Sequence, residues 1–178
     1  MLVARLKQAG TRRRVRVVRA NALRWLSSQR ADRFDAVLSS ELLPELDTNQ
    51  MQSLFIESHR VLRPGGVTVH VILSPNPANS RQRLVIEADS DPRWTRRPPR
   101  KWFSPSAAHT VRALAAAGFP SPRSRRGPGG LTARGEAAQA LLKRWGVRAD
   151  FTRTYAGSLR KGGLELPDWI VAFGSKPH

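Results

Sequence analysis

Three consecutive polar residues, Ser39, Ser40 and Glu41, follow a compact apolar run at residues 34–38. A short apolar run of this kind is expected of a strand buried on both faces in a parallel sheet. Because open α/β sheets bind ligands just beyond the carboxyl ends of their strands, the three residues occupy the place where a functional site is expected. A solvated loop is the alternative interpretation.

The other residue types that carry chemistry are few. The chain contains no cysteine, which excludes disulfide frameworks, thiolate zinc sites and thiol nucleophiles. The four histidines, at positions 59, 70, 109 and 178, do not form a metal-ligand spacing. We therefore expect no metal site, with His59 on a partly exposed helix face and His70 as a hydrogen-bonded histidine within a strand.

The charge balance raises a hypothesis of a different class. A formal net charge of +18 attracts nucleic acid, so a basic nucleic-acid-binding module without catalytic activity is one candidate. The positive residues are mostly Arg, however, and they are scattered along a chain that is also rich in Ala and Pro. A codon bias toward these residues gives the same charge with no partner, so nucleic acid is not the favoured partner.

Aromatic and basic residues gather near the middle of the chain. Trp94, Trp102 and Phe103 are interleaved with Arg and Lys. Such a group could form a lid over a substrate or a stacking platform for nucleic-acid bases. Packing of the aromatic rings over the edge of a sheet is the alternative, because large aromatic side chains are mostly buried.

The polar residues at 39–41 need a sheet to position them, and the pattern around them predicts one. After residues 34–38, Asp47 or Thr48 could cap a helix whose apolar residues recur three and four apart as far as Val61. An Arg-Pro-Gly-Gly turn ends this helix, and the β-branched run at residues 67–73 follows. Strand, helix and strand in this order predict a right-handed parallel βαβ unit.

The flanking segments complete a single α/β domain over residues 1–178. Residues 14–19 alternate Arg and Val as a short strand does, and a short helix over 22–29 follows it. The remaining elements are predicted in chain order: an irregular excursion over 74–104 with a short helix at 81–88, a helix over 105–117, a flexible basic loop over 120–130, a helix over 136–145 and a closing strand over 169–174.

Several stretches, taken in order, resemble a known family. The sequences VRVVRANAL at 15–23, FDAVLSSELL at 34–43 and HRVLRPGGV at 59–67 are similar to the second half of a class I S-adenosylmethionine (SAM)-dependent methyltransferase. Ala117-Gly-Phe and the stretch from Trp169 to Pro177 resemble the end of that domain in ubiquinone- and menaquinone-type methyltransferases that act on small molecules.

The resemblance implies a Rossmann-like sheet with strand order 3-2-1-4-5-7-6 and an antiparallel last strand. Residues 14–19, 34–38, 67–73 and 169–174 correspond to strands 3, 4, 5 and 7. Strands 1 and 2 have no counterpart, and with them the glycine-rich cofactor loop is missing. We therefore expect an N-terminally truncated, partial domain, mostly parallel with an antiparallel C-terminal strand, whose sheet exposes unpaired apolar edges.

The resemblance also implies the cofactor, SAM, and the residues near it. Asn21 and the backbone of Ala22 correspond to the adenine contact, with a turn residue as the alternative for Asn21. Ser39 and Ser40 match the stretch that flanks the sulfonium and the methyl acceptor. Glu41 could act as a catalytic base or orient a substrate, or it could be an exposed acid at a helix start.

The expected function is SAM-dependent methyl transfer to a small organic acceptor, impaired or absent in this chain because the cofactor loop is missing. SAM binding should accordingly be weak or undetectable. No run approaches the length of about 18 apolar residues that crosses a membrane, so we expect a cytoplasmic protein without a membrane partner.

Overall fold

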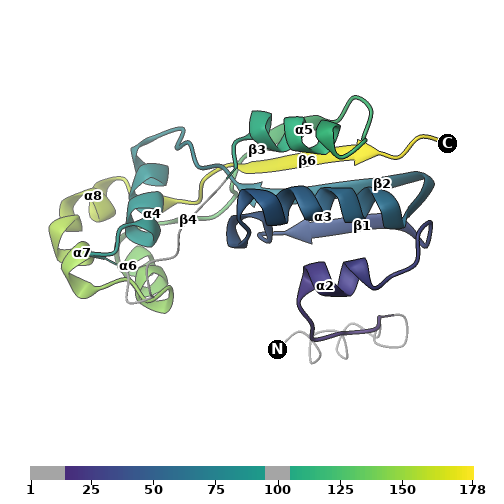
Figure 1. Cartoon of the computed structure of the whole chain (residues 1–178). Coiled ribbons are helices and arrows are strands. Elements are labelled where there is room, and N and C mark those ends of the chain that lie inside the picture. Colours follow the sequence, from purple (N-terminus) through teal and green to yellow (C-terminus); the bar gives the residue numbers. More distant parts are fainter. Residues whose placement is uncertain (1–14, 95–104) are drawn as a thin grey trace.

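A four-stranded sheet organises the molecule. The computed structural model describes residues 15–94 and 105–178. In these residues β1 (Phe34–Ser40), β2 (Leu62–Leu73), β6 (Trp169–Ser175) and β3 (Arg123–Gly127) lie side by side in the order β1-β2-β6-β3 (Figure 1). β1 pairs in parallel with β2, whereas β6 is antiparallel to both of its neighbours. Three strands therefore run one way and the C-terminal strand runs the other, which confirms the predicted fold class.

The connection between β1 and β2 is the predicted βαβ unit. A short 3₁₀ helix, η2 (Leu43–Glu45), precedes α3 (Thr48–Val61). Asp47 caps α3, because its carboxylate accepts from the amide of Gln50 while the Gln50 side chain accepts from the amide of Asp47. The apolar stripe of α3 is buried, and β2 begins at the next residue, so the Arg-Pro-Gly-Gly turn is already part of the strand.

Helices cover one face of the sheet. α3 lies along β1 and β2, α2 (Ala22–Ser27) lies beside α3, and α5 (Ala107–Ala116) lies over β6 and β3 (Figure 1). Phe55 of α3 and Phe119 after α5 are fully buried between these helices and the strands, together with Ile72 of β2. The first hydrophobic core therefore lies on this face of the sheet.

β1 is less buried than its sequence predicted. The expectation of a strand buried on both faces is wrong, because its residues alternate between partly buried and exposed, and Leu38 is 73% exposed. In the part of the chain that the structure describes, β2 is the sole neighbour of β1. An edge strand with one covered face shows this alternation.

The strand predicted at residues 14–19 is also wrong in its described part. Residues 15–19 have no regular secondary structure, and Val15 and Val17 are 42% and 48% exposed. Alternating Arg and Val give a local β preference, but a strand needs a partner for its backbone hydrogen bonds. No strand among residues 15–94 and 105–178 pairs with this segment.

Beyond the carboxyl ends of β1 and β2 lies a second group of elements, here called the helical lobe (Figure 1). It contains α4 (Ser80–Ser90), α6 (Gly135–Arg144), α7 (Ala149–Thr154) and α8 (Ala156–Lys161), and the short strands β4 (Thr132–Ala133) and β5 (Leu164–Glu165). Its own core includes Leu84, Leu142 and Phe151. We call the remainder of the described fold the sheet lobe.

Two predicted irregular segments are more ordered than expected. The basic loop predicted over 120–130 contains β3, which pairs with β6 at the edge of the sheet. Its Arg side chains suit an edge strand because they can extend into solvent while the backbone pairs. The excursion predicted over 74–104 contains α4, longer than the helix expected at 81–88. Residues 95–104, with Trp102 and Phe103, lie outside the described residues.

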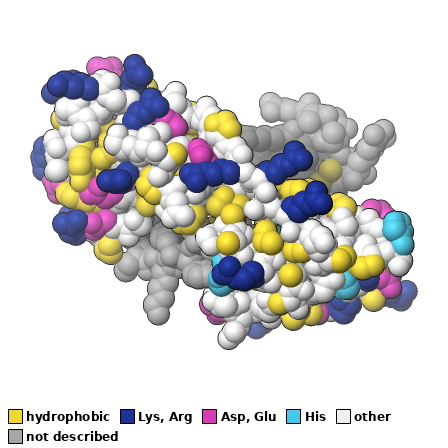
Figure 2. Space-filling model, turned by 90° about the horizontal axis from the view of Figure 1, so that it is seen from above, with side chains coloured by type: hydrophobic (Ala, Val, Ile, Leu, Met, Phe, Trp, Pro, Cys, Tyr) yellow, Lys and Arg dark blue, Asp and Glu magenta, His cyan; other side chains and the backbone are white. Residues whose placement is uncertain are grey.

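The basic side chains are distributed over the surface. Figure 2 shows Lys and Arg side chains spread over the visible face rather than gathered in one patch. Within residues 15–94 and 105–178, no helix is long and apolar enough to cross a membrane.

Candidate functional site

The carboxyl ends of β1 and β2 meet at one edge of the sheet, where Glu41 joins them. The backbone amide of Glu41 donates to the carbonyl of Val71 at 2.9 Å. Its carboxylate Oε1 accepts from the amide of Leu73 at 2.7 Å. Glu41 adopts a left-handed backbone with a φ of 54°, so the chain turns sharply out of β1 at this residue. The carboxylate is thus fixed at the rim of the sheet.

The electrostatic surroundings of Glu41 favour its protonated form. Partial burial raises the pKa of the Glu41 carboxyl above its usual value, and the hydrogen bond from Leu73 opposes this shift. The nearby acids Asp89 and Glu45 raise the pKa further by charge repulsion. A carboxylate with a raised pKa is a stronger base than an ordinary one, so it takes a proton from a bound molecule more readily.

Ser39 is held by a buried chain of hydrogen bonds that the sequence did not predict. Its Oγ lies 2.8 Å from Nδ1 of His70, and Nε2 of His70 lies 2.8 Å from Oγ1 of Thr68. Thr68 Oγ1 also donates to the carbonyl of Val37. Because that donation uses the Thr68 proton, Thr68 accepts from Nε2–H of His70, and the Ser39 hydroxyl then donates to Nδ1.

His70 remains neutral in this arrangement. It is fully buried, its ring packs against Phe55 at 4.7 Å between centroids, and burial lowers its pKa to about 4. The prediction of a hydrogen-bonded strand histidine is confirmed. Its neutrality fixes the direction of the Ser39 hydroxyl, which therefore keeps its oxygen lone pairs available for a donor at the sheet edge.

The remaining predicted cofactor residues are exposed. Ser40 is exposed at the end of β1. Asn21 caps α2, since its Oδ1 accepts from the amide of Arg24 at 3.1 Å, and Ala22 is the first residue of that helix. The structure therefore places Asn21 in a helix cap, and its contact with an adenine ring remains a prediction. Only Ser39 and Glu41 of the predicted set make side-chain hydrogen bonds to β2.

A small apolar cavity of about 240 Å³ opens beside this edge. One wall is the end of β2 and the turn after it, including Leu73 and Pro75, and the opposite wall is one face of α4, including Val85 and Ile86. Leu73 also holds the carboxylate of Glu41, so the acid lies next to the cavity. The sequence predicted the helix that forms this wall, at residues 81–88, but did not predict that it packs against the end of β2.

Two further predictions concern histidine and tryptophan. In the part of the chain that the structure describes, no group of three His, Cys, Asp or Glu residues could hold a metal ion. Trp94 does not lie over the sheet edge: its ring packs against Phe151 and Tyr155 in the core of the helical lobe. His59 is partly buried against Phe119.

Known proteins resemble this chain in sequence and in fold. Residues 1–70 match a family model described as a methyltransferase domain. No curated protein matches the chain. Among solved structures, the YcgJ protein from Bacillus subtilis superposes with a TM-score of 0.64 at 16% identity, over 98% of this chain and 76% of that protein.

Two solved structures described as SAM-dependent methyltransferases also share the fold. The protein from Archaeoglobus fulgidus gives a TM-score of 0.57 at 14% identity, over 90% of this chain and 67% of its own length. The protein from Thermotoga maritima gives 0.53 at 15% identity, over 96% of this chain and 69% of its own length. The methyltransferase-domain match covers less than half of the chain, and the solved structures show that the chain shares the Rossmann-like fold of SAM-dependent methyltransferases.

Proposed function

We propose that this chain takes part in SAM-dependent methyl transfer to a small organic acceptor, with the cavity beside β2 as the acceptor site. The observation that carries the proposal is the position of the Glu41 carboxylate beside an apolar cavity at the carboxyl edge of the sheet. Its volume of about 240 Å³ suits the reacting end of a small molecule. The resemblance to ubiquinone- and menaquinone-type methyltransferases is consistent with an apolar acceptor.

The described residues near the predicted SAM contacts form an open edge of the sheet and do not enclose a cofactor. Asn21, Ala22, Ser39 and Ser40 line none of the four main cavities formed by the described residues. Ser39 can accept one hydrogen bond there, and Asn21 is engaged in a helix cap. The described residues therefore form only part of a SAM site. We propose that this chain binds SAM weakly.

The protein's own contribution is to place and deprotonate the acceptor. The apolar walls from β2 and α4 exclude water from the acceptor's body. Glu41 uses Oε1 to hold the Leu73 amide, and its Oε2 has no hydrogen-bond partner among the described residues. This second oxygen can take a proton from an acceptor O–H or N–H, and the raised pKa of Glu41 makes it a stronger base for that task.

Two measurements test this function. In the first, the chain is incubated with methyl-labelled SAM and a panel of small phenols and amines. Glu41→Gln is compared with Glu136→Gln, the same change on α6 beside a different cavity. Transfer should fall about 10²-fold or more in Glu41→Gln and should be unchanged in the control. Equal rates in the two variants would remove Glu41 from the role of base.

The second measurement is calorimetric titration with SAM. We expect a dissociation constant well above the micromolar range, because the described residues form only a rim. Micromolar binding contradicts the expectation of weak cofactor affinity, and saturating SAM without methyl transfer to any of the phenols or amines contradicts the proposed activity.

A further inference from the structure

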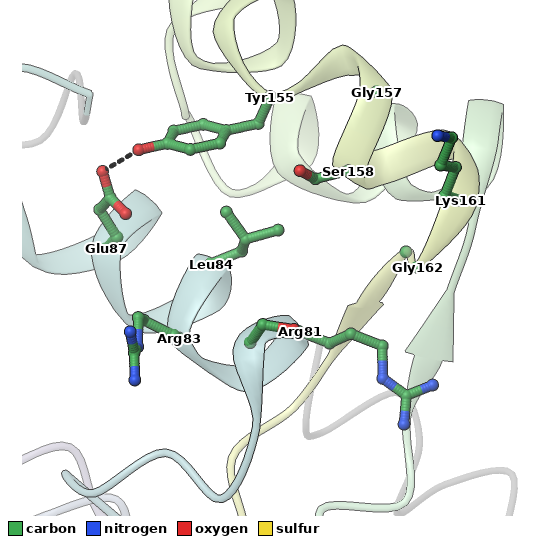
Figure 3. A pocket seen from close by; sticks show the side chains of 11 residues that line it. Arg81, Arg83, Leu84, Glu87, Tyr155, Gly157, Ser158, Lys161 and Gly162 are labelled. Carbon is green, nitrogen blue, oxygen red and sulfur yellow. Dashed lines mark hydrogen bonds between the residues drawn. The ribbon is translucent and has the colours of Figure 1, made fainter.

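A second, larger cavity lies in the helical lobe, away from the sheet edge. It measures about 600 Å³ and opens between α4 and α8 (Figure 3). Leu84 and Glu87 of α4 line it, whereas Val85 and Ile86 line the candidate acceptor cavity. Successive helix residues point about 100° apart, so the two cavities lie on different faces of α4. A molecule in the larger cavity therefore does not occupy the acceptor site.

The walls of this cavity carry more positive than negative charge. Three cations line it, Arg81, Arg83 and Lys161, and the only lining acid among the described residues is Glu87. Arg81 is already paired with Glu165 at 2.5 Å, and Glu87 accepts a hydrogen bond from the hydroxyl of Tyr155.

Two of the cations remain without a negative partner. In residues 15–94 and 105–178, neither Arg83 nor Lys161 makes an ion pair. The cavity therefore has unneutralised positive charge on both of its helical walls, which favours an anionic occupant.

Apolar and hydroxyl groups lie beside these charges. Figure 3 shows the side chains of Leu84 and Ser158 directed into the space between the two helices, with the ring of Tyr155 at one side. Ser158 and Lys161 are three residues apart on α8, so they share one face of the helix. A hydroxyl donor and an ammonium group thus adjoin an apolar wall.

We propose that this cavity binds a small organic oxyanion, a carboxylate or phosphate group carried on an apolar body. The oxyanion lies against Lys161 and Ser158, and the apolar body lies against Leu84 and the Tyr155 ring. Arg83 lines the α4 side of the cavity and adds positive charge at longer range, because its guanidinium points away from Ser158 (Figure 3). This site is separate from the methyl-transfer site and does not rest on the proposed function.

The test uses small probes and the whole chain. Benzoate and phenyl phosphate are titrated by NMR at constant ionic strength, with benzamide as the neutral analogue of benzoate. We expect saturable binding of at least one anion, with shifts confined to α4 and α8, and binding of benzamide at least about tenfold weaker. The relative affinities of the two anions identify which oxyanion the site prefers.

Variants separate a formed site from general attraction to a protein of net charge +18. Lys161→Gln should weaken anion binding about tenfold, whereas Lys143→Gln, the same change on α6 beside a different cavity, should not. Ser158→Leu keeps every charge, removes the hydroxyl donor and places a bulky apolar side chain where the oxyanion is proposed to lie. It should therefore weaken anion binding while the circular dichroism spectrum is unchanged. Equal weakening by the two Lys variants, unchanged binding in folded Ser158→Leu, or no saturable binding of either anion overturns the proposal.

Discussion

The sheet lobe and the helical lobe each have a hydrophobic core, but they treat polar groups differently. The sheet lobe buries Thr68 and His70 in a hydrogen-bonded chain that ends at Ser39. The helical lobe has an aromatic core around Phe151 and places its cations on the walls of an open cavity. Buried and fully bonded polar groups fix one geometry, whereas charges on a cavity wall remain free to meet a ligand. The first arrangement suits orientation of a reacting group, and the second suits binding.

Few polar contacts join the two lobes, and Asp168 makes several of them. Its carboxylate accepts from Arg126 of β3 at 2.7 Å and from Gln82 of α4 at 2.8 Å. Its carbonyl accepts from the amide of Ser74 at 2.7 Å. Asp168 therefore connects the edge of the sheet, the end of β2 and α4.

The largest expected effect tests whether the two cores are independent. Phe55 and Phe151 are both fully buried, one in each core, so replacing either with Ala should cost about 3–5 kcal/mol. We expect Phe151→Ala to lower amide-exchange protection in α6 to α8 while β2 and β6 stay protected, and Phe55→Ala to lower protection in β2. Equal loss across both lobes in Phe151→Ala shows instead that they unfold as one unit.

The second, intermediate effect is a loss of folding stability of the sheet lobe at low pH. The pKa of His70 is lowered from 6.5 to about 4, so the unfolded chain takes up this proton before the folded chain does. Stability is therefore complete above pH 6.5 and falls as pH drops toward 4, by at most roughly 3 kcal/mol. His59, whose pKa is also lowered by burial, acts in the same direction.

Urea unfolding between pH 7 and pH 4 measures this loss. His70→Gln should flatten the pH dependence strongly, whereas His59→Gln, on the partly buried side of α3, should flatten it less because His59 is less buried. If the two variants flatten the curve equally, the buried chain from Thr68 to Ser39 is not the source of the acid sensitivity.

The smallest expected effect concerns Asp168, which connects the two lobes. Asp168→Asn removes the charge that Arg126 and Gln82 share, so the melting temperature should fall by roughly 2–4 °C and the unfolding of the two lobes should become less concerted. Asp91→Asn is the matched control, since Asp91 pairs with Arg93 inside the helical lobe. Calorimetric scans that broaden in both variants alike argue against a joining role for Asp168.

The sequence was informative wherever local chemistry determines structure. The cap at Asp47 and the apolar spacing of α3 depend on residues within a few positions of one another, so the helix and the βαβ unit could be predicted. The strand at residues 14–19 failed because strand formation depends on a partner, which local alternation does not encode. β3 was missed because its Arg-rich composition is typical of a loop, and its pairing with β6 joins residues far apart in the chain.

The site could be predicted only in part, for a related reason. The position of Ser39 and Glu41 at the end of a strand follows from the apolar run before them. Their partners follow from the register of β1 against β2, in which Ser39 lies opposite His70. That register shifts between Phe34 and Ala36, opposite the Arg-Pro-Gly-Gly stretch of β2. Pro and Gly within a strand are typical of a bulge, but the sequence analysis assigned these residues to the turn before the strand.

The turn at Glu41 has a mechanical consequence. A non-glycine residue in the left-handed region stores strain on the order of 1 kcal/mol, which glycine would avoid. The hydrogen bond from the Leu73 amide to the Glu41 carboxylate helps to hold the chain in this strained conformation.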